Sequence, residues 1–162
     1  MTDAHYHLVV NHFPIIGTIF GVGILIAGVF LKNNIVKNVS YVLFIVAAIF
    51  AALSVKTGGM AAGVVKGMPN ITREIIHEHA EIAENLALVL YVLAIVSLLG
   101  LYTNIKNHGK ANLVSYLALV ISFVAVFLAQ QAGTTGGEIR HTEIREGYKA
   151  SNAETDKYQY ND

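Results

Sequence analysis

The chain has 162 residues, of which 54% are hydrophobic and only 14% charged, and its formal net charge is zero. The length suits one domain, but a soluble surface normally carries about 25% charged residues. Without a basic stripe or any cysteine, the sequence predicts no nucleic-acid partner, no disulfide, no iron–sulfur cluster and no covalently attached c-type haem. We therefore expect a membrane protein whose main partner is the lipid bilayer.

Four uncharged stretches predict four membrane-spanning helices. In chain order they are Ala4–Leu31, Asn38–Val55, Asn85–Ile105 and Ala111–Gly137. Each has about 18 residues or more, enough for a helix to cross a hydrocarbon layer of roughly 30 Å. Helices satisfy their own backbone in lipid, whereas open strands do not. The first stretch is longer than a signal-peptide core and lacks a clean cleavage site, so we expect it to be retained.

The connections between these helices differ in charge. The links KNNIVKN and KNHGK are short, basic and free of acids, whereas all the acids lie in the N-terminus, the second link and the C-terminal region. The positive-inside rule then places both basic loops in the cytoplasm and both termini outside. Short links between neighbouring helices favour an all-α, up-down-up-down four-helix bundle. In a bacterium this arrangement predicts an inner-membrane protein with both termini on the periplasmic face.

The polar segments divide the chain further. We expect a four-helix transmembrane domain over residues 1–147 and a polar tail over residues 148–162, which has no apolar period and is extended or disordered. The stretch TGGMAAGVVKGMPN is rich in small residues and is predicted to be a flexible link as far as Pro69. From Thr72 onward the sequence predicts a continuous helix, with acids near its N-terminus, where the helix dipole favours them.

Histidines gather on one side of this topology. Six of the seven are predicted on the outer face: His5, His7, His12, His77, His79 and His141. Pro14 is expected in the first turn of the first helix, where its missing N–H costs little, with His12 facing inward. For His5 and His7, so close to the terminus, a position at the membrane interface is the simpler interpretation.

One interpretation of the outer histidines is a haem held by two imidazoles from facing helices. Neutral imidazole is a standard axial ligand, and helical bundles can present two such rings. Small residues around Gly58 and Gly136 would leave room for a flat macrocycle. Three cations, Lys56, Arg73 and Arg140, are candidates to meet its propionates.

Two other kinds of site remain open. Glu74 with His77, and Glu138 with His141, have the E-x-x-H form found in non-haem metal sites of helical bundles. The first two helices contain no Glu, so the di-iron pattern is incomplete, but a copper, zinc or iron site built mainly from histidines would need fewer carboxylates. The third interpretation is a quinone or proton site, in which His and Glu exchange protons at the interface.

The number of residues between a histidine and the lysine at the cytoplasmic end of its helix indicates how high that histidine lies in the membrane. The interval from His12 to Lys32 is shorter than the interval from His79 to Lys106, by about two helical turns. Straight helices would therefore place these two rings about 10 Å apart in height. The interval from His5 to Lys32 equals that from His79 to Lys106, so His5 matches His79 better.

Four short motifs occur in one order along the chain: HFPI from His12, TG at Thr57–Gly58, HEHAEIAENLA from His77, and GGEIRHTEI from Gly136. Together they resemble the motifs of an uncharacterised family of bacterial four-helix membrane proteins with an HFPI signature. The resemblance implies that His12, His79 and His141 are the site residues. The run after His141 departs from the family pattern, because HTEIREG replaces the family's HGVGV.

The resemblance also bears on function. Relatives of this kind are sometimes joined to c-type cytochrome modules on the outer face, which implies electron transfer and favours haem b as the cofactor. A c-type cytochrome or a respiratory complex is then the expected partner. We therefore expect a haem-bearing electron carrier, with a metal-binding module or a structural subunit of a larger membrane complex as alternatives. No nucleophile–base pair or phosphate loop indicates a free-standing enzyme.

Overall fold

A computed structural model describes residues 2–145 and 147 of the chain. Its helices are α1 (Asp3–Val10), α2 (His12–Phe30), α3 (Asn34–Val65), α4 (Arg73–Ile105) and α5 (Ala111–Arg140), followed by the short 3-10 helix η1 (Thr142–Ile144). No strand occurs in these described residues, so the all-helical prediction is confirmed for them. Four helical segments are long and apolar enough to span a membrane, as expected. The predicted tail, 148–162, lies outside the described residues.

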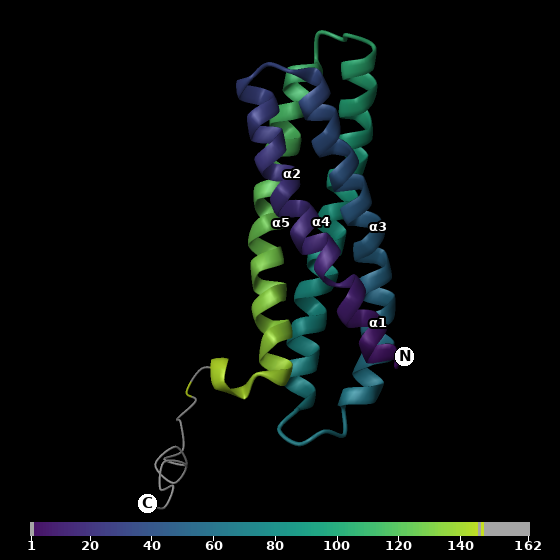
Figure 1. The fold of residues 1–162 in the computed structure, drawn as a ribbon, viewed down its shortest axis with the longest axis vertical. Helices are drawn as coiled ribbons and strands as arrows, with labels where there is room; N and C mark the ends of the chain where they lie inside the picture. Colours follow the sequence, from purple (N-terminus) through teal and green to yellow (C-terminus); the bar gives the residue numbers. More distant parts are fainter. Residues whose placement is uncertain (1, 146, 148–162) are drawn as a thin grey trace, which may run out of the picture.

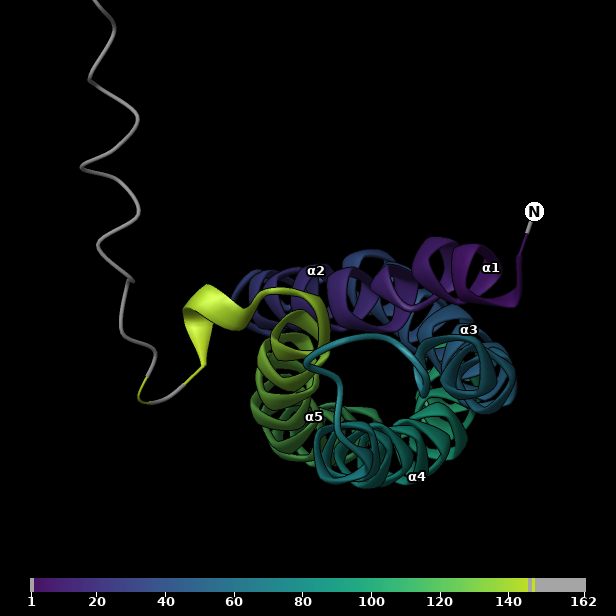
Figure 2. The ribbon, with the colours of Figure 1, turned by 90° about the horizontal axis from the view of Figure 1, so that it is seen from below.

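The long helices α2, α3, α4 and α5 surround a common axis, and α1 lies against the outside of α3 (Figure 2). The α2–α3 and α4–α5 connections lie at one end of the bundle, the loop end (Figure 1). The N-terminus, the α3–α4 link and η1 lie towards the opposite end, the histidine end (Figure 1). Each long helix packs against two neighbours in the ring.

The first predicted span is divided at Asn11 into α1 and α2, and the two helices run in different directions (Figure 1). Pro14 explains the division. It has no N–H to donate to the Val10 carbonyl one turn earlier, and its ring crowds that carbonyl. Helix α1 therefore ends at Val10, and α2 begins with Pro14 in its first turn, as predicted. Because of this bend, α1 leaves the axis of α2 and reaches the far part of α3.

The second span is longer than the sequence predicts. Helix α3 continues beyond the expected end at Val55, up to Val65, so the prediction of a flexible link from Thr57 is wrong for most of that stretch. Glycine inside a helix costs up to about 1 kcal/mol relative to alanine, but here the packing of α1 on α3 offsets that cost. The predicted start of α4 is confirmed, with the Thr72 hydroxyl accepting a hydrogen bond from the Ile75 N–H.

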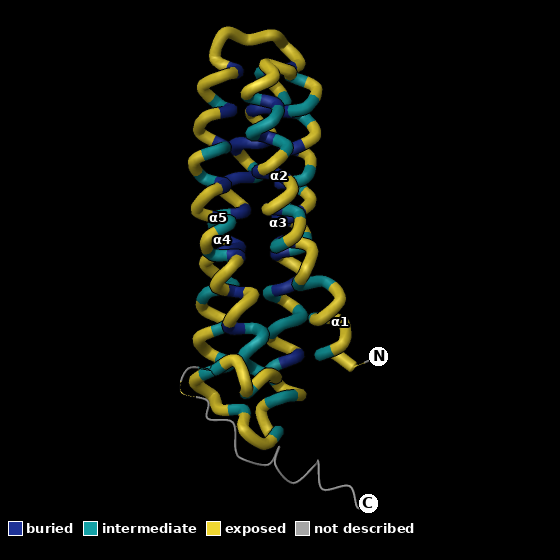
Figure 3. The backbone as a smooth tube through the Cα atoms, turned by 60° about the vertical axis from the view of Figure 1, so that its left-hand side comes forward, coloured by how far each residue is buried: buried dark blue, intermediate teal, exposed yellow. Residues whose placement is uncertain are grey.

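Buried positions lie along the inner side of the bundle and exposed positions along its outside (Figure 3). The buried set is partly polar, while many of the exposed side chains are large and apolar. Fully buried residues include Ser40, Ser97, Ser115 and Ser122, beside alanines on α3 and α5. Large apolar side chains such as Phe20 and Leu88 are more than half exposed. This distribution is the reverse of a soluble bundle and is typical of helices that pack closely in lipid through small residues.

Gly100 provides one such close contact. A Cβ atom added at this position would lie 2.5 Å from the ring of Tyr41, which is fully buried and donates a 2.9 Å hydrogen bond to Ser115. We predict that Gly100→Ala lowers the unfolding free energy by about 1–3 kcal/mol through overpacking. Thermal unfolding in detergent measures this effect. Gly63→Ala is the matched control, because a Cβ there meets nothing within 4 Å, and an equal loss in both variants would contradict the prediction.

Candidate functional site

The histidine end contains one imidazole on α1 whose position is fixed by α3. His7 is half-buried, and its Nδ1 lies 3.2 Å from the Thr57 hydroxyl oxygen. Thr57 donates its own proton to the Leu53 carbonyl at 2.8 Å. The hydroxyl can therefore only accept from His7, which places the ring proton on Nδ1 and leaves a lone pair on Nε2. A Cβ at Gly58 would lie 3.2 Å from Cε1 of His7, so glycine there leaves room for the ring.

The same arrangement is repeated between α4 and α5. Nδ1 of His79 lies 3.2 Å from the Thr135 hydroxyl oxygen, and Thr135 donates to the Gln131 carbonyl at 3.0 Å. A Cβ at Gly136 would lie 3.0 Å from Cε1 of His79. One half of the bundle thus supplies a histidine on α1 and a Thr–Gly pair on α3, and the other half supplies a histidine on α4 and a Thr–Gly pair on α5. Both imidazoles share one tautomer, with Nε2 unprotonated, and neither Nε2 makes a hydrogen bond to a described residue.

The two rings lie close to each other at the histidine end of the bundle. The ring centroids of His7 and His79 lie 6.3 Å apart, and the ring planes cross at 74°. A metal–imidazole bond of about 2 Å, with roughly 1 Å from the nitrogen to the ring centre, places two rings on opposite sides of one metal about 6 Å apart. The observed separation therefore fits two axial ligands of a single metal. The same separation and crossed planes are also those of an edge-to-face pair of aromatic rings.

Two cavities adjoin this histidine pair. Their volumes are about 350 and 470 Å³, and both are lined by His7 and His79. Volumes of this size are typical of cofactor sites. Asn11 and Ser54 also line both cavities, and each has a buried side-chain oxygen, Oδ1 and Oγ respectively, without a hydrogen-bond partner among the described residues. Two further buried oxygens without such a partner, on Ser97 and Asn104, lie outside both cavities.

The three histidines implied by the family resemblance all border the larger cavity. His79 belongs to the pair just described, but His12 and His141 are exposed. His12 donates from Nδ1 to the Leu8 carbonyl at 2.9 Å. His12 thus borders the same cavity as His79, whereas the ring that lies next to His79, with centroids 6.3 Å apart, is that of His7. The secondary candidates His5 and His77 are exposed and border neither cavity.

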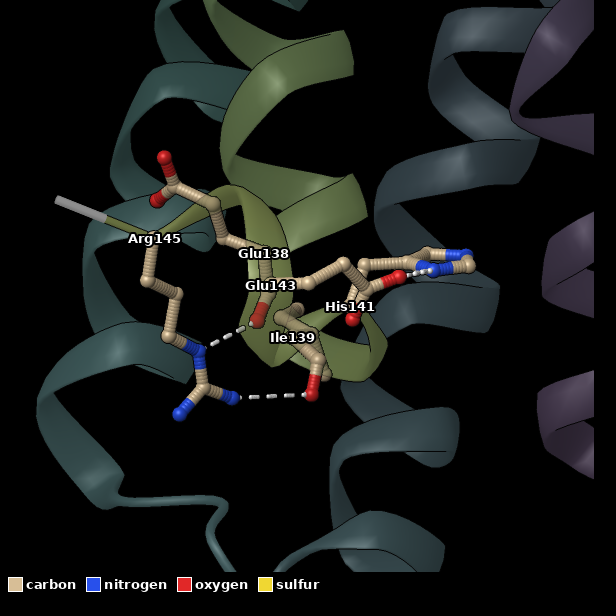
Figure 4. A network of polar contacts seen from close by, with 5 residues as sticks. All are labelled: Glu138, Ile139, His141, Glu143 and Arg145. Carbon is tan, nitrogen blue, oxygen red and sulfur yellow. Dashed lines mark hydrogen bonds and ion pairs between the residues drawn. The ribbon is translucent and has the colours of Figure 1, made fainter. Parts of the chain in front are cut away.

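The segment after α5 holds His141 at the rim of the larger cavity. Nδ1 of His141 lies 2.8 Å from Oε1 of Glu143, and Arg145 donates to the carbonyl oxygens of Glu138 and Ile139 (Figure 4). A hydrogen bond from its own backbone N–H, followed by that from His141, lowers the pKa of Glu143 from its ordinary value. Arg145 also donates to the Asn70 carbonyl in the α3–α4 link, so it connects the segment after α5 to that link.

Most of the charged candidates lie away from the pair. Arg140 lines both cavities, whereas Lys56, Arg73, Glu74 and Glu138 line neither. Among residues 2–145 and 147, no group of three or more His, Asp or Glu side chains is placed to hold a metal ion. The E-x-x-H pairs therefore do not come together as one such group in the described chain. What the structure brings together is two imidazoles, not a cluster of protein ligands.

The fold and its four apolar helices define a multi-pass, all-α membrane protein. No protein-family model, curated protein or solved structure matches the chain. The resemblance carried by the four short motifs stays a prediction, and the site is interpreted from its own residues.

His7 lines both cavities and lies beside His79 in the structure, although it was not among the candidate site residues predicted from the sequence. One indication was its expected height in the membrane. The interval from His7 to Lys32 is nearly the same as that from His79 to Lys106, whereas the interval from His12 to Lys32 is clearly shorter. A second signal was the repeated Thr–Gly pair, at residues 57–58 and 135–136. Because one Thr–Gly pair lies on the second predicted span and the other on the fourth, they predict two equivalent histidines on the first and third spans.

Proposed function

We propose that the chain spans the bacterial inner membrane as an up-down-up-down bundle with its histidine end on the periplasmic side. The charge distribution supports this orientation. Lys32, Lys37, Lys106 and Lys110 lie at or near the loop end, and no Asp or Glu occurs between residues 4 and 73 or between 85 and 137. The positive-inside rule places such acid-free basic loops in the cytoplasm. The N-terminus and the end of α5 then lie outside.

We further propose that His7 and His79 are the two axial ligands of a b-type haem, and that the protein transfers electrons. The observation that carries this proposal is the 6.3 Å separation of two imidazole centroids whose Nδ1 protons are both held by threonines. A hydrogen-bond acceptor behind a histidine ligand fixes its tautomer and raises its basicity. The two cavities that His7 and His79 both line support a ligand in the same place.

The number of ligands favours haem over a bare metal ion. A protein-bound zinc or copper ion normally requires three or four protein ligands, and the described residues bring no group of three acids or histidines together. A haem iron requires only two axial ligands, since the macrocycle provides the other four. A site with two imidazoles and a large cavity therefore fits haem better than the copper, zinc or iron alternative.

Each side chain of the site has a role in this proposal. His7 and His79 bind the iron, Thr57 and Thr135 orient the rings, and Arg140 is the cation placed to meet a propionate. A bound haem would supply reversible one-electron chemistry. Its place at the outer end of the bundle suits exchange of electrons with a c-type cytochrome or a respiratory complex on that side of the membrane. His12 and His141 lie at the cavity rim, where they are available to hydrogen bond.

An absorption spectrum of the detergent-purified protein tests the proposal. After expression with added haem precursor, we expect a Soret band and, on reduction with dithionite, the sharp visible bands of a low-spin haem with two histidine ligands. A colourless protein that carries stoichiometric copper, zinc or iron by elemental analysis would instead establish the metal-binding alternative. A protein with neither haem nor metal would contradict both proposals and favour a structural subunit.

A further inference from the structure

A lysine is buried at the loop end of the bundle, opposite the end that holds the histidine pair. Lys37, in the first turn of α3, is only 2% exposed. Its Nζ donates a 2.9 Å hydrogen bond to Oδ1 of Asn112 on α5. Gly28 on α2 leaves space for it, because a Cβ there would lie 2.9 Å from Cγ of Lys37. The packing of three helices therefore fixes this ammonium group in place.

The ammonium group has no anionic partner among the described residues. A lysine carries three N–H donors, and the one side-chain hydrogen bond of Lys37 goes to a neutral amide. The nearest acids along the chain are Asp3 and Glu74, both at the histidine end. Within residues 2–145 and 147, the one side-chain ion pair joins His141 to Glu143. Because a buried charge is costly unless it is paired, a bound anion would stabilise Lys37.

A polar cavity provides the place for that anion. It has a volume of about 370 Å³ and lies between the α2–α3 and α4–α5 connections, lined by Lys32, Asn34, Lys37, His108, Asn112 and Ser115 among others. His108 contributes a donor as well. Its Nδ1 accepts a 3.2 Å hydrogen bond from the Lys110 backbone N–H, which places the ring proton on Nε2. Two lysines, an imidazole N–H and amide groups thus line one space that has no carboxylate among its described lining residues.

We propose that this cavity binds a phosphate group, held by Lys37 and Lys32. The phosphate can come from the headgroup of an anionic phospholipid or from free phosphate. Basic pockets between transmembrane helices on the cytoplasmic side recognise lipid headgroups of this kind. The surface beside the cavity suits acyl chains, because Phe30 is 82% exposed and Leu31 is 70% exposed. This site is independent of the haem proposal and lies at the opposite end of the bundle.

Thermal unfolding of the full chain in detergent tests the inference and separates the two sources. The titrants are short-chain phosphatidylglycerol, the matching phosphatidylcholine, and inorganic phosphate. If the site takes a lipid headgroup, we expect phosphatidylglycerol to raise the melting temperature in a saturable way. If it takes free phosphate, we expect inorganic phosphate to do so as well. The apparent affinity should fall at least about fivefold in Lys32→Gln and further in Lys37→Met. Lys106→Gln is the matched control, since Lys106 lies at the same end but does not line the cavity.

Asn112→Asp gives a test that does not remove the buried lysine. A carboxylate at this position would pair directly with the Nζ of Lys37 and take the place of the ligand. The variant should remain folded and no longer respond to phosphatidylglycerol or phosphate. Equal stabilisation by phosphatidylcholine and phosphatidylglycerol would overturn the inference. So would an unchanged response in Asn112→Asp and Lys32→Gln, or no response of the wild-type protein to either source of phosphate.

Discussion

Replacing either His7 or His79 with alanine is expected to abolish haem binding. Removal of a single residue that only orients a metal ligand typically costs 10–100-fold in affinity. Removal of the ligand itself should therefore lower haem affinity by more than about 100-fold. Each variant would be purified from cells supplied with haem precursor, and the ratio of Soret to protein absorbance would be compared with that of the wild type.

The same experiment distinguishes the residues that sequence and structure favour. His5→Ala and His77→Ala are matched controls, because both histidines are exposed and border neither cavity. These two variants should retain full haem content. His12→Ala should retain haem with at most a shifted spectrum, because His12 lies at the rim and not beside His79. Loss of haem in His12→Ala with retention in His7→Ala would contradict the proposed ligand pair and restore the one implied by the resemblance.

Rescue by imidazole distinguishes loss of a haem ligand from loss of the fold. In His79→Gly, a free imidazole can occupy the space left by the side chain and bind the iron in its place. We expect imidazole added to the buffer to restore the low-spin spectrum in this variant. A melting temperature unchanged from that of the wild-type apoprotein would show that the loss of haem does not come from loss of fold.

The number and approximate position of the helices could be predicted because charge is excluded from lipid. Charged residues flank each uncharged stretch, so the four spans could be predicted from the sequence alone. Their exact ends could not, because they depend on contacts between elements distant in the sequence. Helix α3 continues through Gly58 and Gly59 where α1 packs on it. The local composition there favours a flexible link, and tertiary packing overrides it.

The proposed ligand pair was harder to predict than the region that contains it. Topology placed six histidines at one end, and four of them border one cavity in the structure. Which two meet depends on the bend before Pro14, which directs α1 across α3 and takes His7 to Thr57. The consequence of a proline can be located in a sequence, but the direction of the resulting bend is set by packing.

The two ends of the bundle have different chemistry, which follows from where the chain places its few charges. The histidine end carries neutral imidazoles with unprotonated Nε2 atoms, suited to a metal. The loop end carries ammonium groups without acids, suited to an anion. Between them the interior combines serines and alanines with larger buried side chains such as Phe44 and Leu90. Substitutions at one end should therefore leave ligand binding at the other end unchanged.

Replacing the threonine behind either histidine with valine should weaken haem binding by about 10–100-fold while keeping the fold. Thr57→Val and Thr135→Val conserve the shape of the side chain but remove the acceptor for the Nδ1 proton of His7 or His79. The imidazole then becomes a weaker donor to iron, so the midpoint potential of any haem that remains bound should become more positive. Haem titration of the apoprotein and a potentiometric titration measure the two effects.

Thr134→Val provides the control for this prediction. Thr134 is next to Thr135 in the sequence, but it is exposed and its hydroxyl bonds only to the Gln130 carbonyl of its own helix. It should change neither affinity nor potential. Because the two Thr–His contacts have the same length and tautomer, Thr57→Val and Thr135→Val should also shift the potential in the same direction. Shifts of opposite sign, or an equal shift in Thr134→Val, would show that the threonines do not act through the imidazoles, and the two-histidine site would lose its main physical support.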